Sequence, residues 1–149
     1  MAVVSENIAE LALELGRAMN EMKSRLRQQI RSKISEYDPE LSFELLEIIG
    51  LLWRKDGINQ QEIAEIVSKD KSSVTYLINS LVKRGLVKRV ENKNDRRNKQ
   101  VFLTPKGRQI RKIIFPWVLD LYQQAAGDTG SDQIRNAIAL LKKMTTNLG

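Results

Sequence analysis

Apolar residues in the first part of the chain repeat with the period of an α-helix. Ser5 stands at an N-cap position. The apolar residues that follow are spaced three or four apart: Ile8, Leu11, Leu15, Ala18 or Met19, Met22, Leu26 and Ile30. This spacing predicts one long amphipathic helix from Ser5 to about Ile34. A small domain can hardly cover such a stripe by itself, so we expect a partner chain to cover the remainder.

Capping residues predict two more helices between residues 39 and 67. Pro39 favours a turn, and the second helix then starts at Ser42 and stops before Gly57, which stands at a C′-type position. A short third helix begins at Asn59, with Glu62 three residues later as the reciprocal partner of a capping box. The segment "SKDK", residues 68–71, is the predicted turn after this third helix.

A fourth helix has one apolar face and one unusual polar face. Asp70 or Ser68 can cap it, and Gly85 ends it in the left-handed position. Its apolar face carries Val74, Leu77, Ile78, Leu81 and Val82. The opposite face carries mostly small hydrogen-bonding side chains, namely Ser72, Ser73, Thr75, Tyr76, Asn79, Ser80 and Lys83. A solvated helix would carry Glu and Lys there, so this face is predicted to be a contact surface.

A β-hairpin and two further helices complete the pattern. Residues 86–90 and 99–103 are short, β-branched or aromatic, and roughly alternating, which predicts a hairpin whose long tip is the polar segment 91–98. Thr104 and Pro105 are expected to start a helix that Pro116 kinks or breaks, and Ser131 opens the last helix. The fold is therefore predicted to be one domain, 1–149, mainly α with a small β-hairpin wing: a winged helix-turn-helix at 42–103 with long flanking helices.

The positive charge of the protein is concentrated in one segment. The net charge is +7, but residues 69–112 hold 14 basic and 3 acidic residues, whereas residues 1–68 hold 8 and 12. Such an excess suits a polyanion, because each neutralised phosphate releases counterions; a solvated basic face is the alternative. Because the basic segment coincides with the predicted helix-turn-helix, whose second helix fits a major groove, double-stranded DNA is the expected partner.

Cysteine and histidine are both absent from the sequence. Their absence removes disulfides, thiolate nucleophiles, imidazole bases and nearly every zinc or haem site. No Gly-rich phosphate loop or carboxylate pair in an apolar context replaces them, so neither an enzyme nor a cofactor or metal site is expected. The start of the chain lacks a basic leader, and its apolar runs fall short of the ~20 residues of a membrane helix, which predicts a cytoplasmic protein without membrane contact.

The segment "DRRNKQVFLTPKG" resembles the wing of the MarR family of bacterial transcriptional regulators. The family pattern is Asp, any residue, Arg, then Leu-Thr, two residues and Gly, which here are Asp95, Arg97, Leu103, Thr104 and Gly107. Residues 63–89 similarly follow the family's third helix, recognition helix and first wing strand. The resemblance implies a homodimer, with its interface formed by residues 5–36 and 105–148, that acts as a repressor by binding an imperfect inverted repeat in DNA.

The resemblance also assigns DNA contacts to the fourth helix and to the wing. The helix set is Lys71, Ser72, Ser73, Thr75, Tyr76, Asn79 and Lys83, and the wing set is Lys93, Asp95, Arg96, Arg97 and Lys99. Asn79 is expected to pair with adenine, Ser73 or Thr75 to touch a thymine methyl or an acceptor, and Lys71, Tyr76 and Lys83 to suit phosphates. The family often has arginine where this chain has Tyr76, a departure that favours an A·T-rich operator over guanine readout.

Arg97, with Arg96 as its neighbour, is the residue expected to enter the minor groove. Asp95 is an anion, so it is expected to hold an arginine rather than to touch DNA. Which of the two arginines reaches the groove stays open, and a floppy charged loop is the alternative.

Regulators of this family often release DNA when a small lipophilic or phenolic ligand binds between the dimer helices and the DNA lobe. The expected lining of such a pocket is Met19, Met22, Phe43, Trp53 and Trp117, although core packing explains the same positions more simply. The alternative function for the whole chain is an architectural winged helix protein that binds nucleic acid without sequence choice.

Overall fold

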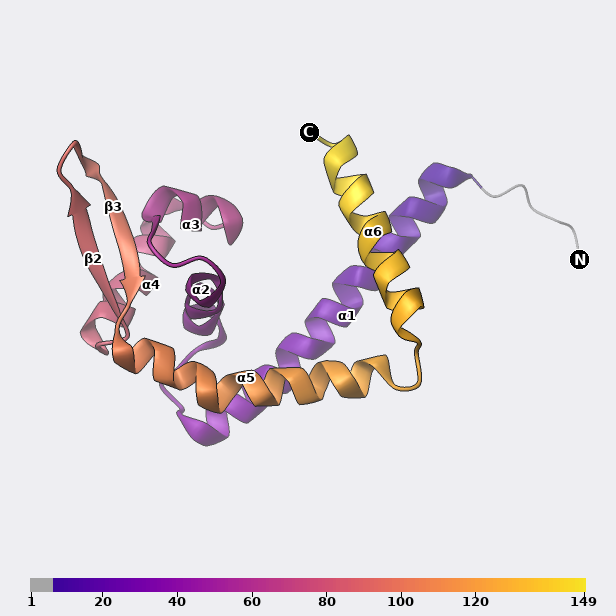
Figure 1. Ribbon diagram of the computed structural model, residues 1–149, viewed down its shortest axis with the longest axis horizontal. Helices are drawn as coiled ribbons and strands as arrows, with labels where there is room; N and C mark the ends of the chain where they lie inside the picture. The colour runs from indigo at the N-terminus through magenta and orange to yellow at the C-terminus, as the bar shows by residue number, and fades with distance from the viewer. Residues whose placement is uncertain (1–6) are drawn as a thin grey trace, which may run out of the picture. The chain divides into compact units, whose positions relative to one another are not determined.

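The computed structural model describes residues 7–149, except for the side chains of Arg96 and Arg97. The elements follow in the order α1 Ile8–Tyr37, α2 Phe43–Arg54, β1 Ile58–Asn59, α3 Gln60–Ile66, α4 Lys71–Lys83, β2 Val87–Asn92, β3 Asp95–Leu103, α5 Pro105–Ala126 and α6 Ser131–Asn147 (Figure 1). The chain forms two compact units, Met1–Trp117 and Val118–Gly149. The predicted fold class, mainly α with a small β wing, is confirmed.

The first unit is built around a three-stranded antiparallel sheet in the order β1-β3-β2. Helices α2, α3 and α4 contact this sheet. Two of its strands, β2 and β3, form the hairpin at the left of Figure 1. The core between helices and sheet is fully apolar and includes Ile49, Ile63, Ile78, Leu81 and Val101, each essentially inaccessible to solvent. Burial of these branched side chains fixes α3 and α4 against the sheet.

Helix α1 begins and ends at different residues from those predicted. Ser5 lies outside the described residues, and the N-cap is Asn7, whose Oδ1 accepts from the backbone N–H of Ala9 at 2.8 Å. Asn is as strong an N-cap residue as Ser, so the helix can start at Asn7. The helix runs on to Tyr37 because the first residue that proline forces out of helical geometry is Asp38, directly before Pro39.

The end of α2 corrects the role predicted for Gly57. The helix ends at Arg54 with Lys55 as its C-cap, so Gly57 lies two residues beyond the cap rather than at C′. Gly57 is nevertheless left-handed, with φ of 76°, and a Cβ there would lie 2.6 Å from the Phe102 ring. Glycine is therefore required where the chain turns against Phe102 and enters β1.

Asn59 is shared between a strand and a helix. It pairs with Gln100 in β3, and it also caps α3, where its Oδ1 accepts from the Glu62 backbone N–H at 2.8 Å. Its Nδ2 donates to Glu62 Oε1 at 3.0 Å, so the predicted reciprocal pair forms through the two side chains. The two-residue strand β1 was not predicted from the sequence.

The hairpin has a short turn, so the predicted long tip at 91–98 is wrong. Strands β2 and β3 extend to Asn92 and Asp95, and Asn92 Oδ1 accepts from the Asn94 backbone N–H at 3.1 Å. Strand pairing uses backbone groups, so polar side chains did not prevent it. Glu91 pairs with Lys99 but Asn92 pairs with Asp95, and residues 96–98 therefore form a bulge without partners on β2.

Thr104 caps α5 as predicted, since its Oγ1 accepts from the Gly107 backbone N–H at 3.1 Å. The helix continues through Pro116 to Ala126, so the proline does not break it. The boundary between the two units follows directly after Trp117. No helix in the described part of the chain is long and apolar enough to cross a membrane.

Candidate nucleic-acid interface

Asp70 caps the start of helix α4, and three buried residues on one face pack this helix against the core. Asp70 Oδ1 accepts from the Ser73 backbone N–H at 2.7 Å, and the hydrogen bonds from Ser73 hold the pKa of the Asp70 carboxyl below its ordinary value of 3.8. Val74, Ile78 and Leu81 are buried against the core. The opposite face of α4 is consequently turned outward in a fixed orientation.

The outward face carries the predicted recognition residues. Lys71, Ser72, Ser73, Tyr76, Asn79 and Lys83 are exposed, and Thr75 is half-buried. Tyr76 is 74% exposed, so its ring is not part of the core. An exposed tyrosine surrounded by uncharged hydrogen-bonding groups is unusual for a solvated helix face, whereas it suits contact with phosphates and base edges.

Arg89 and Gln60, which were not predicted from the sequence, make hydrogen bonds to side chains of this face. Arg89 on β2 donates through Nη2 to Asn79 Oδ1, and through Nε to Gln60 Oε1 at 2.7 Å. Gln60 at the start of α3 donates in turn through Nε2 to Thr75 Oγ1 at 3.4 Å. Arg89 thus connects α3, α4 and the wing. Its partners lie 10 and 29 residues away, so no local pattern marked it.

Arg89 carries a charge that its surroundings do not neutralise. It makes no ion pair with any residue whose side chain the structure describes, and burial lowers the pKa of its guanidinium. Arginine stays protonated nevertheless. A half-buried cation without a carboxylate partner leaves positive potential between α4 and the wing, where an anion is favoured.

The wing residues are placed along the end of the hairpin. Lys93 lies in the turn, and Asp95 and Lys99 lie on β3; all three are exposed. The side chains of Arg96 and Arg97 are outside the described residues, but their backbone forms part of the bulge at 96–98. A bulge re-aims side chains away from the regular alternation of a strand.

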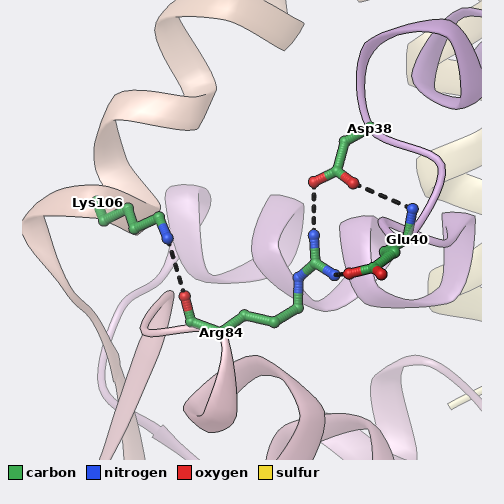
Figure 2. A network of polar contacts seen from close by, with 4 residues as sticks. All are labelled: Asp38, Glu40, Arg84 and Lys106. Carbon is green, nitrogen blue, oxygen red and sulfur yellow. Dashed lines mark hydrogen bonds and ion pairs between the residues drawn. The ribbon is translucent and has the colours of Figure 1, made fainter.

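The C-terminal end of α4 is held by a separate polar network, which Figure 2 shows. Arg84 donates through Nη2 to Asp38 Oδ2 at 2.5 Å, and its Nη1 lies 3.5 Å from Glu40 Oε2. Lys106 at the start of α5 donates to the Arg84 carbonyl at 3.2 Å. The end of α4 is therefore tied both to the α1–α2 turn and to α5.

The residues predicted for a ligand pocket do not gather in one place. Trp53 lines a cavity of about 610 Å³, together with Leu52, Asp56, Leu103, Arg108, Arg111, Lys112, Phe115 and Pro116. Phe43 instead stacks under the Arg27 guanidinium at 4.7 Å, and Trp117 packs edge-on against Tyr37 at 5.5 Å. Met19 and Met22 are exposed on α1.

Two helices joined by a tight turn, followed by an antiparallel hairpin, define a winged helix-turn-helix protein, and α4 is the second helix of that unit. The MarR family model matches residues 41–99, which span α2, α3, α4 and most of the hairpin. The resemblance to the MarR family is confirmed by this match and by relatives in sequence and in structure.

Among those relatives is the multiple antibiotic resistance protein MarR of Escherichia coli K12, 32% identical over 88 residues, which are 58% of this chain and 61% of that protein. The crystal structure of a MarR transcriptional regulator from Methanosarcina mazei Go1 has a TM-score of 0.78 and 26% identity, covering 89% of this chain and 94% of that one. A C80S mutant of E. coli MarR, solved with operator DNA, has a TM-score of 0.73, 24% identity, and coverage of 93% and 99%. The chain spans 37% of one curated relative and 61% of another.

Proposed function

We propose that the protein is a sequence-specific DNA-binding transcriptional regulator. The observation that carries the proposal is the outward face of α4, where exposed serines, Tyr76 and Asn79 stand on a helix fixed by its buried face. A major groove admits one such helix, and base edges are read by uncharged donors and acceptors of this kind. E. coli MarR, a structural neighbour, binds operator DNA as a complex.

In this proposal the wing binds the adjacent minor groove. Arg97, with Arg96 beside it, enters the groove, and Asp95 holds one of the two arginines in place. The bulge supports this arrangement because residues 96–98 are not constrained by pairing with β2. Lys93 and Lys99 are exposed on either side and bind phosphates.

The regulator acts as a homodimer on an imperfect inverted repeat. Supporting this, Ile8, Leu11, Met19 and Met22 leave an exposed apolar stripe along α1. In the second unit as described, none of the residues of α6 is buried, although Ile134, Ile138 and Leu140 are apolar. A second copy covers these faces, using residues 5–36 and 105–148. A monomer in sedimentation at micromolar concentration would contradict this step.

The proposal further includes that the protein acts in the cytoplasm as a repressor, and that a small lipophilic or phenolic ligand relieves the repression. The cavity beside Trp53 supports this step, because the rings of Trp53 and Phe115 line the cavity together with the basic side chains of Arg108 and Arg111. An aromatic acid needs apolar surface for its ring and a cation for its carboxylate. The measurement is DNA release on titration with salicylate, with Trp53→Leu as the variant that should bind the ligand more weakly.

Selection from random duplexes at near-physiological salt tests the central proposal. It should return an inverted repeat with half-sites about one helical turn apart. Asn79→Ala should relax the preference at one base pair by roughly 1 to 3 kcal/mol, and Arg97→Ala should reduce the salt slope by about one unit. Binding that stays sequence-blind would instead support an architectural winged helix protein.

A further inference from the structure

We infer that Arg89 is a specificity-determining positioning residue, which holds the side-chain amide of Asn79 in one orientation toward DNA. The inference rests on the proposed function, because it concerns how α4 reads bases. It adds a residue on β2 that the recognition-helix face itself does not include. Arg89 is half-buried between α3 and α4, and its side chain reaches both helices.

The chemistry of the guanidinium decides which way each amide points. Arginine has only donors, so it can be approached only by an acceptor. Asn79 must therefore turn its Oδ1 to Arg89, and Gln60 must do the same with its Oε1. A donor-only partner therefore fixes the orientation of both amides.

This orientation leaves Asn79 with its Nδ2 donors for DNA. Nδ2 makes no hydrogen bond to any described residue, and the side chain is exposed. In the major groove, purine N7, guanine O6 and thymine O4 accept hydrogen bonds, whereas cytosine presents only its N4 donor. The base that faces Asn79 is therefore expected to be a purine or thymine, and cytosine is expected to be disfavoured.

The same network limits what Thr75 can read. Its hydroxyl donates to the Lys71 carbonyl at 2.9 Å and accepts from Gln60 Nε2 at 3.4 Å. The donor of the hydroxyl is consequently used inside the protein, and the methyl group is what Thr75 offers to DNA. Of the two contacts expected for Ser73 or Thr75, the apolar one to a thymine methyl falls to Thr75.

Lysine could not replace Arg89 in this role. The planar fork reaches Gln60 on one helix and Asn79 on the other through Nε and Nη2, in two fixed directions. An ammonium group keeps the charge but is a single point on a flexible stem. Arg89→Lys therefore separates positioning from electrostatic attraction.

The test compares Arg89→Lys with Lys88→Arg, a charge-preserving change at the neighbouring exposed residue of β2. Each variant is assayed against the selected operator and its single base-pair variants. Arg89→Lys should keep sequence-blind affinity within about twofold and lose discrimination at one base pair by roughly 5- to 150-fold. The base pair should be the one relaxed by Asn79→Ala, and the double variant should lose no more there. Lys88→Arg should match the parent.

Three results of the binding assays would overturn the inference. The first is an Arg89→Lys protein that discriminates at every base pair as the parent does. The second is a loss of discrimination that is spread evenly over all base pairs of the operator. The third is that the losses of the Arg89→Lys and Asn79→Ala variants add in the double variant. In the free protein, Arg89→Lys should also shift the NMR resonances of the Asn79 side-chain amide while the protein stays folded; unchanged resonances contradict the contact itself. A parent protein that selects no sequence refutes the proposed function, and the inference about base reading falls with it.

Discussion

Replacing Gly107 by alanine would place a methyl carbon 2.2 Å from the backbone carbonyl oxygen of Leu86. Gly107 lies in the first turn of α5, where that helix crosses the start of β2, and its own carbonyl accepts from Trp53 Nε1 at 3.1 Å. Carbon–oxygen contacts in proteins are about 3.3 Å, so the Leu86 carbonyl or α5 would have to move by about 1 Å. The obstacle is backbone and cannot simply rotate away.

The expected cost of Gly107→Ala follows from three contributions. Overpacking a tight site costs typically 1–3 kcal/mol, and a rigid backbone neighbour favours the upper part of that range. Moving the Leu86 carbonyl also weakens the hydrogen bond that it accepts from the Thr104 backbone N–H at 3.1 Å, worth about 1 kcal/mol. Alanine gains about 1 kcal/mol over glycine in helix propensity. The last two terms nearly cancel, so the protein should lose about 2–3 kcal/mol.

Urea unfolding followed by circular dichroism, at one protomer concentration, measures this loss. Gly50→Ala is the matched control, because Gly50 lies inside α2 and a Cβ there meets nothing within 4 Å. The control should be as stable as the parent or more stable by up to about 1 kcal/mol. A Gly107→Ala protein that behaves like the control would refute the steric reasoning.

Three other changes give sharp expectations. Arg84→Leu leaves Asp38 without its guanidinium partner at 2.5 Å and should lower the free energy of unfolding, measured in urea, by about 1.5–3 kcal/mol. If the losses of Arg84→Leu and Asp38→Ala simply add in the double variant, the two residues do not interact and the expectation is contradicted. The folded-state pKa of Asp70 is lowered, so its contribution to stability is fully present above the ordinary value of 3.8 and is lost as pH falls through the folded-state pKa. Asp70→Asn should therefore lose less thermal stability than the parent as pH falls below 3.8. Asn59→Ala removes the cap of α3 and should cost about 1 kcal/mol in urea unfolding, whereas Glu62→Ala, which removes only the side-chain bond, should cost less.

The starts of α2, α3, α4 and α5 were predictable because capping is a local interaction. Ser42, Asn59, Asp70 and Thr104 each accept a hydrogen bond from a backbone N–H three residues later, and the sequence shows both partners at once. The recognition face was predictable for a similar reason, since helical periodicity separates it from Val74, Ile78 and Leu81. The roles of these residues at DNA stay predictions.

Features that depend on distant partners were not predictable from local patterns. Strand β1 has only two residues, and Ile58 becomes a strand because Val101 offers its backbone. Arg89 looked like one basic residue among many until α3 and α4 placed Gln60 and Asn79 beside it. The turn at residues 93–94 was missed because polar residues resemble a loop whether or not their backbone pairs.

The two roles of Asn59, in strand β1 and as the cap of α3, limit which segments can be exchanged between homologous proteins. Because β1 pairs with β3 and its second residue caps α3, the wing and the helix-turn-helix share one backbone junction. A chimera that exchanges only the hairpin, 87–103, would place foreign side chains against Ile58 and would lose Arg89 from beneath α4. Wing exchange between homologues should therefore succeed with residues 58–103 taken as one block, and the natural unit of transfer is the sheet together with α3 and α4.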